Sequence, residues 1–231
     1  MKIVVALGGE IADSDLLRAR VAGAELTIAA DSGAARLEQA GLSPDVVIGD
    51  FDSLSESELA ALQERGVEIV PHPDPQQRTD GHVALQLATE RGASEVILLG
   101  AGGGGRLDHQ LTNLLFLVAE EFAAMPISAV SLWTEAVGLH GHETGFGRDD
   151  ARFAGEPGDY VSLVALGAVR GVTSDGLRWP LEGVDMELGL AGAISNIQIV
   201  CNGAALSNSR QRTYTNALDR VWFGKEVFQR R

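Results

Sequence analysis

Short apolar runs alternate with amphipathic segments along the first half of this 231-residue chain, and the alternation strongly limits its possible folds. The runs that predict strands are 3–7, 26–30, 46–48, 68–70 and 96–99. The segments that predict helices are 13–22, 32–39, 55–65, 79–90 and the stretch from 108. Strands that alternate with helices form a parallel sheet with helices on both faces. We therefore predict an α/β, Rossmann-like domain over residues 1–134.

The pattern changes after Pro126, where short β-rich runs separated by glycine replace the helices. These runs are 127–133, 160–166, 169–173, 177–181 and 194–201. They predict an antiparallel all-β sandwich or barrel, which we assign to residues 135–231, with a loop at 138–158. The segment after Ser207 is basic. It is predicted to be helical because its apolar residues have helical spacing, namely Tyr214, Leu218, Val221 and Trp222.

Composition limits the partners. The chain has 18 Lys and Arg against 32 Asp and Glu, a net charge of −14, so we expect no nucleic-acid partner. Its single cysteine, Cys201, allows neither an intrachain disulfide nor a cysteine-based zinc site. No apolar run reaches membrane-spanning length, and the first apolar run is too short for a signal peptide. We therefore expect a cytoplasmic protein without a membrane partner.

Aspartates follow the predicted strands at the edge where ligands bind open α/β sheets. Asp31, Asp50 and Asp52 come directly after strands, whereas Asp80 and Asp108 stand at helix starts. Side by side these carboxylates repel one another, so the arrangement favours Mg²⁺ bound between protein and substrate phosphates. The alternative for Asp31, Asp80 and Asp108 is a purely structural role as helix N-caps.

A glycine-rich turn in residues 100–113 joins the fifth predicted strand to a helix. Its glycines let the backbone approach a ligand closely, and Arg106 offers a two-pronged donor to phosphate oxygens. The stretch also fits G-x-G-x-x-G, but no acidic residue ends a strand about 20 residues later, as dinucleotide binding requires. It lacks the lysine of a Walker A loop. The alternative is a flexible turn without function.

Several stretches, taken in order, resemble the thiamine pyrophosphokinase family. They are ADSGAARL (30–37), PDVVIGDFDSL (44–54), QRTDGHVAL (77–85), GGRLDHQLTN (104–113), GVTSDGLRWPL (171–181) and ISN (194–196). The resemblance implies an α/β catalytic domain joined to a β-sandwich domain, working as a homodimer with active sites at the subunit interface. It also implies transfer of a pyrophosphoryl group from ATP to thiamine, with Mg²⁺ and release of AMP.

The resemblance also implies roles for individual residues. Asp50, Asp52 and Asp80 would bind the metal and triphosphate, and with Arg106 and Asp108 they are the expected catalytic residues. The expected nucleotide-binding residues are Asp31, Ser32, Gly33, Gly104, Gly105 and Arg106. The expected thiamine-binding residues are Asp108, His109, Trp179, Ser195 and Asn196. The tryptophan assignment competes with the simpler expectation that Trp179 is a core residue.

The chain departs from the family pattern at Gln77, where an aspartate is usual, and at Ala35, where an asparagine is usual. Two alternatives therefore stay open. One is a pyrophosphokinase for another heterocyclic alcohol, such as a pterin. The other is a catalytically weakened module that binds thiamine diphosphate or nucleotide. An NAD-dependent Rossmann dehydrogenase is the last alternative.

Overall fold

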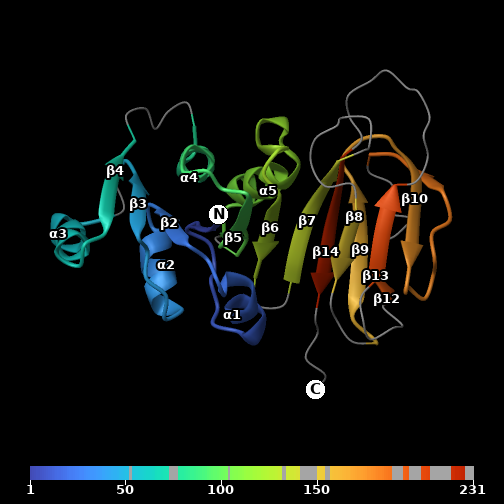
Figure 1. Ribbon diagram of the computed structural model, residues 1–231, viewed down its shortest axis with the longest axis horizontal. Coiled ribbons are helices and arrows are strands. Elements are labelled where there is room, and N and C mark those ends of the chain that lie inside the picture. Colours follow the sequence, from blue (N-terminus) through green and yellow to red (C-terminus); the bar gives the residue numbers. More distant parts are fainter. Residues whose placement is uncertain are drawn as a thin grey trace. The chain divides into compact units, whose positions relative to one another are not determined.

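The computed structural model describes residues 1–51, 54–72, 78–103, 105–131, 134–140, 150–153, 157–188, 195–197, 204–208 and 220–226. The chain forms two compact units (Figure 1). The first comprises Met1–Phe116 and Ile127–Leu132, and the second comprises Leu117–Pro126 and Trp133–Arg231.

A parallel sheet forms the centre of the first unit, with strand order β6-β5-β1-β2-β3-β4. Its strands are β1 (Lys2–Ala6), β2 (Leu26–Ala30), β3 (Val46–Gly49), β4 (Glu68–Pro71), β5 (Glu95–Leu99) and β6 (Ile127–Val130). From β1 the chain first builds outward through β2 to β4, and then returns to add β5 on the other side of β1. The strand order therefore reverses between β1 and β5, and such a switch point creates a ligand-binding crevice.

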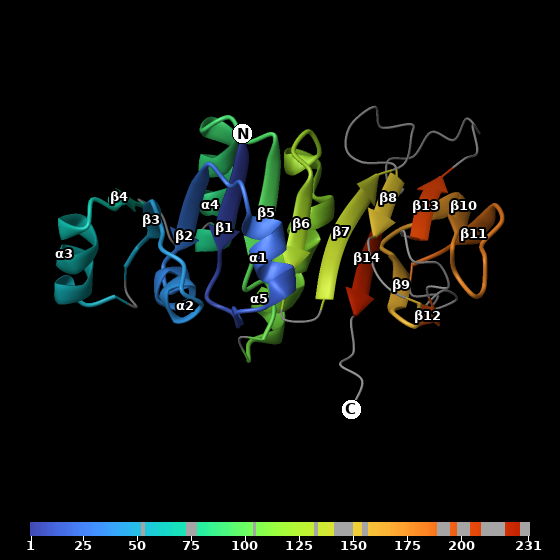
Figure 2. The ribbon, with the colours of Figure 1, turned by 60° about the horizontal axis from the view of Figure 1, so that its bottom comes forward.

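Helices cover both faces of this sheet. They are α1 (Asp15–Val21), α2 (Gly33–Gln39), α3 (Glu56–Glu64), α4 (Asp80–Glu90) and α5 (Leu107–Leu115). After α5 the chain forms two short 3₁₀ helices, η1 (Phe116–Val118) and η2 (Glu120–Phe122), and Leu117–Pro126 belongs to the second unit. Leu17, Leu37 and Leu62 bring α1, α2 and α3 into one buried cluster on one face of the sheet. Figure 2 shows α1 in front of the sheet and α4 behind it. The predicted α/β class is confirmed.

Helix starts in the first unit follow the predicted capping chemistry. The Ser55 hydroxyl accepts a hydrogen bond from the Glu58 N–H at 3.3 Å, and the Glu58 carboxylate accepts one from the Ser55 N–H at 2.8 Å. This is a capping box, which satisfies two backbone donors at the start of α3. Thr79 caps α4 by accepting from the His82 N–H at 3.3 Å. Both helices therefore start where their sequences predict.

Two antiparallel sheets form the second unit, with strand orders β12-β9-β14-β7 and β11-β10-β13-β8. Their strands are β7 (Thr134–His140), β8 (Asp150–Phe153), β9 (Tyr160–Ala165), β10 (Val169–Asp175), β11 (Val184–Met186), β12 (Asn196–Ile197), β13 (Ala204–Asn208) and β14 (Arg220–Glu226). Buried side chains from both sheets, including Leu139, Leu163 and Val172, form one core cluster. The all-β sandwich is thereby confirmed.

Four expectations about the antiparallel domain were wrong. Ile127–Val130 forms β6, which pairs parallel with β5 in the first unit. Residues 220–226, which include Val221 and Trp222, form strand β14 and not a helix, because β7 and β9 on either side pair with its backbone. The expected loop at 138–158 contains the end of β7 and all of β8. Residues 177–181 form no strand of their own. Tyr214 and Leu218 belong to the part of the chain that is not described.

None of the helices among the described residues combines the length and apolarity that crossing a membrane requires.

Replacing Leu163 with alanine tests the sandwich core. Leu163 is 0 % exposed, so Leu163→Ala should lower the free energy of unfolding by about 2–5 kcal/mol through lost burial and a residual cavity. Urea denaturation of the full chain, followed by circular dichroism, measures the change. Leu188→Ala is the matched control because Leu188 is 69 % exposed. Equal losses for the two variants would contradict the assigned core.

Candidate active site

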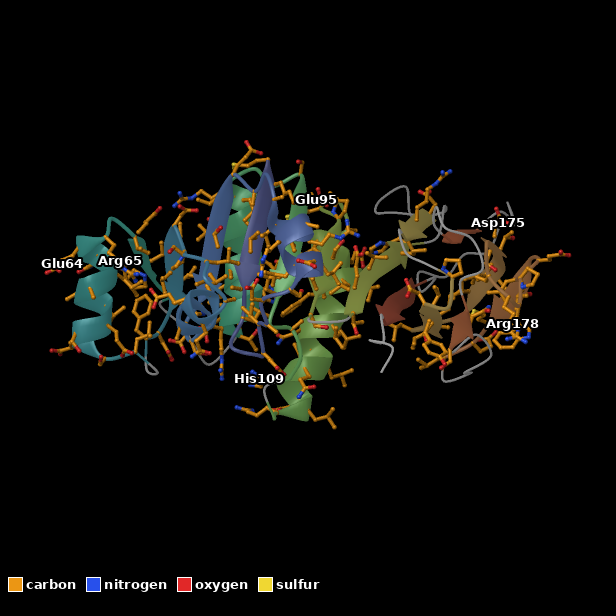
Figure 3. The ribbon with its side chains drawn as sticks, turned by 90° about the horizontal axis from the view of Figure 1, so that it is seen from below. Glu64, Arg65, Glu95, His109, Asp175 and Arg178 are labelled. Atoms are coloured by element: carbon orange, nitrogen blue, oxygen red, sulfur yellow. The ribbon has the colours of Figure 1, made fainter. Side chains whose placement is uncertain are left out.

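Two adjoining cavities open at the carboxyl edge of the parallel sheet, next to the switch point between β1 and β5. The larger has a volume of about 490 Å³ and is lined by Leu7, Gly8, Ala30, Asp31, Ser32, Asp50, Arg78, Thr79, Asp80, Gly81, Arg106, His109 and Asn113. The smaller, of about 180 Å³, is lined by Gly8, Gly9, Ser32, Gly100, Ala101, Gly102, Arg106, His109, Gln110 and Asn113. Figure 3 shows Glu95, where β5 begins, and His109, in the helix that follows β5, at opposite edges of the sheet.

Three carboxylates from separate loops line the larger cavity: Asp31 after β2, Asp50 after β3 and Asp80 at the start of α4. Asp31 is 8 % exposed, and its N–H donates to the Ile48 carbonyl at 2.8 Å, which fixes the turn after β2. Burial raises the pKa of the Asp80 carboxyl, and the negative charges of Asp31 and Asp50 raise it further. The structure thus brings three of the predicted site residues together as interacting like charges.

The interpretation of Asp31, Asp80 and Asp108 as helix N-caps was wrong. The cap positions belong to Ser32, Thr79 and Arg106. Asp80 and Asp108 lie in the first turn of their helices, one residue or more past the cap. An acid there interacts favourably with the helix dipole, and the Asp108 carboxylate accepts a hydrogen bond from the His109 N–H, but neither acid occupies the cap position.

The backbone at the ends of β2 and β3 adopts conformations that side chains disfavour. Asp31 has φ +45° and Phe51 has φ +61°, both in the left-handed region. Such residues cost free energy on the order of 1–3 kcal/mol each and tend to cluster at functional sites. They turn the chain sharply at the sheet edge, where Asp31 and Asp50 face the cavity.

Close backbone contact joins the loop after β1 to the glycine-rich turn after β5. The Gly9 N–H donates to the Gly100 carbonyl at 3.1 Å, and the Glu10 N–H donates to the Gly102 carbonyl at 3.0 Å. A Cβ at Gly9 would lie 2.3 Å from the first of these oxygens and 2.2 Å from the second, so no larger residue fits. Sequence reasoning missed Gly8 and Gly9. Their position directly after a strand, like that of the later glycines, is the signal that could have found them.

Gly33 serves packing in this structure. A Cβ there would lie 2.2 Å from the Ala6 carbonyl oxygen, so the glycine lets α2 approach the end of β1 closely. Neither Gly33 nor Gly105 lines the two cavities, although Gly105 lies in the turn that carries Arg106 and has φ +75°. Ser32, between Asp31 and Gly33, lines both cavities.

Arg106 and Asp108 form a two-pronged ion pair at the start of α5. Nε of Arg106 donates to Oδ1 of Asp108 at 3.2 Å, and Nη2 donates to Oδ2 at 2.5 Å. The hydrogen bonds from Arg106 lower the pKa of the Asp108 carboxyl to about 2. Arg106 lines both cavities, whereas Asp108 lines neither. Since both side chains are about two-thirds exposed, the pair adds little to stability and can open for an anionic ligand.

Arg78 and Asn113 also line the larger cavity, and sequence reasoning did not select them. Nη1 of Arg78 donates to the Gln86 side chain at 2.6 Å, which ties the guanidinium to α4. Nδ2 of Asn113 donates to the Ala101 carbonyl at 3.4 Å. Asn113 follows His109 by one helical turn, and this i, i+4 spacing could have identified it as part of the same face.

Two expected site residues, Asp52 and Gly104, fall outside the described residues, as does Gln77. Among the described side chains, no three of His, Cys, Asp and Glu are placed to hold a metal ion together. Mg²⁺ commonly takes one or two carboxylates together with phosphate oxygens and water. The donor chemistry of Asp50 and Asp80 therefore fits a metal that arrives with a phosphate ligand.

The expected thiamine-binding residues of the second unit also come together. Trp179 is 54 % exposed, so the expectation that it is a core residue was wrong. The backbone N–H of Trp179 donates to Oδ1 of Asn196 at 3.1 Å, and the backbone carbonyl of Trp179 accepts from Nδ2 of Asn196 at 2.6 Å. Ser195 has φ +60°, and its N–H donates to the Ser162 hydroxyl at 3.0 Å. Asp108 and His109 belong to the first unit.

An acid-lined cavity with an arginine beside it, at the switch point of a parallel sheet, is typical of enzymes that bind metal-complexed phosphates. Comparison with known families makes this class more specific. The family model described as "Thiamin pyrophosphokinase, catalytic domain" matches residues 17–128. The family model described as "Thiamin pyrophosphokinase, vitamin B1 binding domain" matches residues 151–209.

Individual relatives agree with the family match. A thiamine pyrophosphokinase of Bacillus subtilis is 26% identical over 179 residues, covering 77% of this chain and 80% of the relative. Thiamine pyrophosphokinase 1 of rice is 31% identical over 167 residues, covering 68% of this chain and 59% of that relative. The crystal structure of a B. subtilis thiamine pyrophosphokinase superimposes with a TM-score of 0.78 at 21% identity, covering 99% of this chain and 100% of that one. The chain belongs to the thiamin pyrophosphokinase family.

Neutralising Asp80 tests the charge repulsion in the larger cavity. Because the pKa of Asp80 is raised above the ordinary 3.8, the folded state holds this proton more tightly than the unfolded state. Stability is therefore lost as the pH rises from 3.8 through the raised pKa. Asp80→Asn should raise the thermal midpoint at neutral pH without divalent cations, and this gain should vanish below pH 3.8.

Differential scanning calorimetry at several pH values measures the gain. Glu64→Gln is the control. Glu64 lies at the end of α3, far from His109, which lines the same cavity as Asp80 (Figure 3). A lower midpoint for Asp80→Asn than for wild type at neutral pH would show that Asp80 stabilises the fold.

Proposed function

We propose that this protein transfers the pyrophosphoryl group of ATP to the hydroxyl of thiamine, which gives thiamine diphosphate and AMP. The observation that carries the proposal is the grouping of Asp31, Asp50 and Asp80 with Arg106 around one cavity, in a chain of this family. The hydroxyl oxygen attacks the β-phosphorus while AMP leaves. Such a transfer needs mainly positioning and charge neutralisation from the protein.

The first unit is the proposed site for ATP and Mg²⁺. Asp50 and Asp80, together with Asp52, would hold the metal, which would neutralise the phosphate oxygens. Burial and, after it, the charges of Asp31 and Asp50 raise the pKa of Asp80, so its ionised form is unfavourable without a cation, which supports this assignment. The proposed nucleotide contacts are Asp31, Ser32, Gly33, Gly104, Gly105 and Arg106.

Arg106 and Asp108 have different roles in this proposal. The Arg106 guanidinium would exchange its carboxylate partner for phosphate oxygens, which have a matching two-oxygen geometry. A carboxyl with a pKa of about 2 accepts protons poorly at neutral pH, so Asp108 would hold Arg106 or orient the thiamine hydroxyl. His109 lines both cavities and is a further proposed contact near that hydroxyl.

The second unit is the proposed binding region for thiamine itself. Thiamine carries a positively charged thiazolium ring. The indole of Trp179 is 54 % exposed and already holds the Arg178 guanidinium 5.2 Å from its ring centroid, so it is a surface of the kind that binds cations. Ser195, next to the loop that carries Trp179, is the other proposed contact, and Asn196 belongs to the proposed set through its two hydrogen bonds to the Trp179 backbone. The division of roles between residues 1–134 and 135–231, a homodimeric assembly and a cytoplasmic location are parts of the same proposal.

An AMP-release assay tests the reaction. The full chain incubated with ATP, Mg²⁺ and thiamine should produce AMP and thiamine diphosphate in equal amounts. Omission of thiamine should abolish both products. AMP release with a pterin alcohol but not with thiamine would identify another acceptor. Binding of thiamine diphosphate without any turnover would identify a binding module, and either result would contradict the proposed activity.

Replacing Arg106 with lysine should separate charge from geometry. Arg106→Lys keeps the positive charge but loses the forked donor, so kcat should fall about 10²-fold, in the range found when one transition-state donor is removed. Steady-state AMP release measures the effect. The matched control is Arg65→Lys, because Arg65 pairs with Glu38 away from the cavities. An Arg106→Lys variant with the turnover of wild type would remove Arg106 from the phosphate site.

A further inference from the structure

The side chain of Asn196 is bonded to both main-chain polar groups of one other residue, Trp179. Oδ1 accepts from the Trp179 N–H at 3.1 Å, and Nδ2 donates to the Trp179 carbonyl at 2.6 Å. Donor and acceptor of the amide thus reproduce the hydrogen bonds that a neighbouring strand would offer. Asn196 is only 3 % exposed, so it presents almost no surface to a ligand.

The loop between β10 and β11 that carries Trp179 is anchored on both sides of the tryptophan. Before it, Leu177 is 2 % exposed and packs in the sandwich core. After it, the Leu181 N–H donates to the Ser174 hydroxyl at 2.8 Å, and the Ser174 N–H donates to the Leu181 carbonyl at 2.9 Å. Asn196 fixes the middle of the loop, where no strand among the described residues pairs with the backbone of Trp179.

The position of Asn196 is itself fixed by the strand beside it. Asn196 begins β12, which pairs with β9 opposite Val161. The residue before it, Ser195, has φ +60°, and its N–H donates to the hydroxyl of Ser162 on β9 at 3.0 Å. Asn196 therefore connects β9, in one sheet, to the loop that follows β10, in the other. The indole of Trp179 is left 54 % exposed at the end of this connection.

We propose that Asn196 is a positioning residue that acts on thiamine through Trp179 and does not itself contact the substrate. This inference rests on the proposed function, because it takes Trp179 as the surface on which thiamine binds. Proline follows Trp179 and disfavours helical backbone for it, so the two Asn196 bonds select among the remaining conformations. They thereby set the direction in which the indole leaves the backbone. Because the loop is already ordered before thiamine binds, little conformational entropy is lost on binding.

A double-mutant cycle on the full chain tests the proposal. Asn196→Ala should raise the KM for thiamine about tenfold, as expected for about 1.4 kcal/mol from two lost buried hydrogen bonds. The KM for ATP should stay unchanged, because the first unit is untouched. In a Trp179→Ala background, Asn196→Ala should raise the KM for thiamine by less than twofold, since no indole remains to be positioned.

Other outcomes of the cycle overturn the proposal. Multiplicative effects of the two changes would mean that Asn196 contacts thiamine independently of Trp179. A lower thermal midpoint with an unchanged KM for thiamine would mean that Asn196 serves stability alone. Asp175→Ala is the control, because it removes a hydrogen bond to the Gly176 N–H in the same loop. Figure 3 shows Asp175 apart from Arg178, the residue before Trp179. This variant should leave the KM for thiamine unchanged.

A second variant and a second measurement keep the proposal testable if the Asn196→Ala variant folds poorly. Asn196→Asp keeps the size and the acceptor for the Trp179 N–H but loses the donor to the Trp179 carbonyl, so it should raise the KM for thiamine with the same dependence on Trp179. Hydrogen exchange of the Trp179 amide requires no activity. The Trp179 amide should be protected in wild type and exchange faster in both variants. Equal exchange in all three proteins would show that Asn196 does not hold the Trp179 backbone. A wild-type chain that protects this amide but does not turn over thiamine would refute the proposed function alone.

Discussion

The edge of the parallel sheet depends on the contact between the loops that follow β1 and β5. Pairing of the two strands continues past their ends, first from the Leu7 N–H to the Leu99 carbonyl at 2.9 Å and then from Gly9 to Gly100 at 3.1 Å. Loops at a switch point usually diverge, and their divergence opens the crevice. Here backbone hydrogen bonds join the two loops, and Gly9, Gly100 and Gly102 line the smaller cavity. The absence of Cβ atoms is therefore a structural requirement as well as an opportunity for ligand approach.

Electrostatics at the same edge opposes folding and favours ligand binding. Asp31 and Asp50 follow strands and Asp80 begins α4, so the fold brings three carboxylates to one cavity. Burial raises the pKa of Asp80, and the charges of Asp31 and Asp50 raise it further. A cation that binds between these groups lowers the free energy of the folded state and is bound more tightly for that reason. Functional sites often retain such locally unfavourable charges.

Local patterns in the sequence were sufficient where a single element determined the outcome. Apolar runs located the strands of the first unit, and the capping residues Ser55 and Thr79 located two helix starts. Helical spacing failed for Val221 and Trp222, because the neighbouring strands β7 and β9 supply hydrogen bonds that local spacing cannot anticipate. Long-range pairing of this kind overrides local preference. The acids of the larger cavity could be proposed from strand ends, whereas the need for glycine at position 9 follows only from contacts with Gly100 and Gly102, some 90 residues later in the chain.

Motif matching identified Asp108 and Asn196 but could not tell which group each one contacts. Both side chains are bonded to another residue of the proposed site: Asp108 to the guanidinium of Arg106, and Asn196 to the backbone of Trp179. Transfer of a phosphoryl group demands that reacting groups be held within a fraction of an ångström, so the residues that hold ligand-binding groups are as necessary as those groups. A sequence motif records both kinds without distinction. Hydrogen-bond geometry separates them: in the proposed function Arg106 and Trp179 contact the ligands, and Asp108 and Asn196 position them.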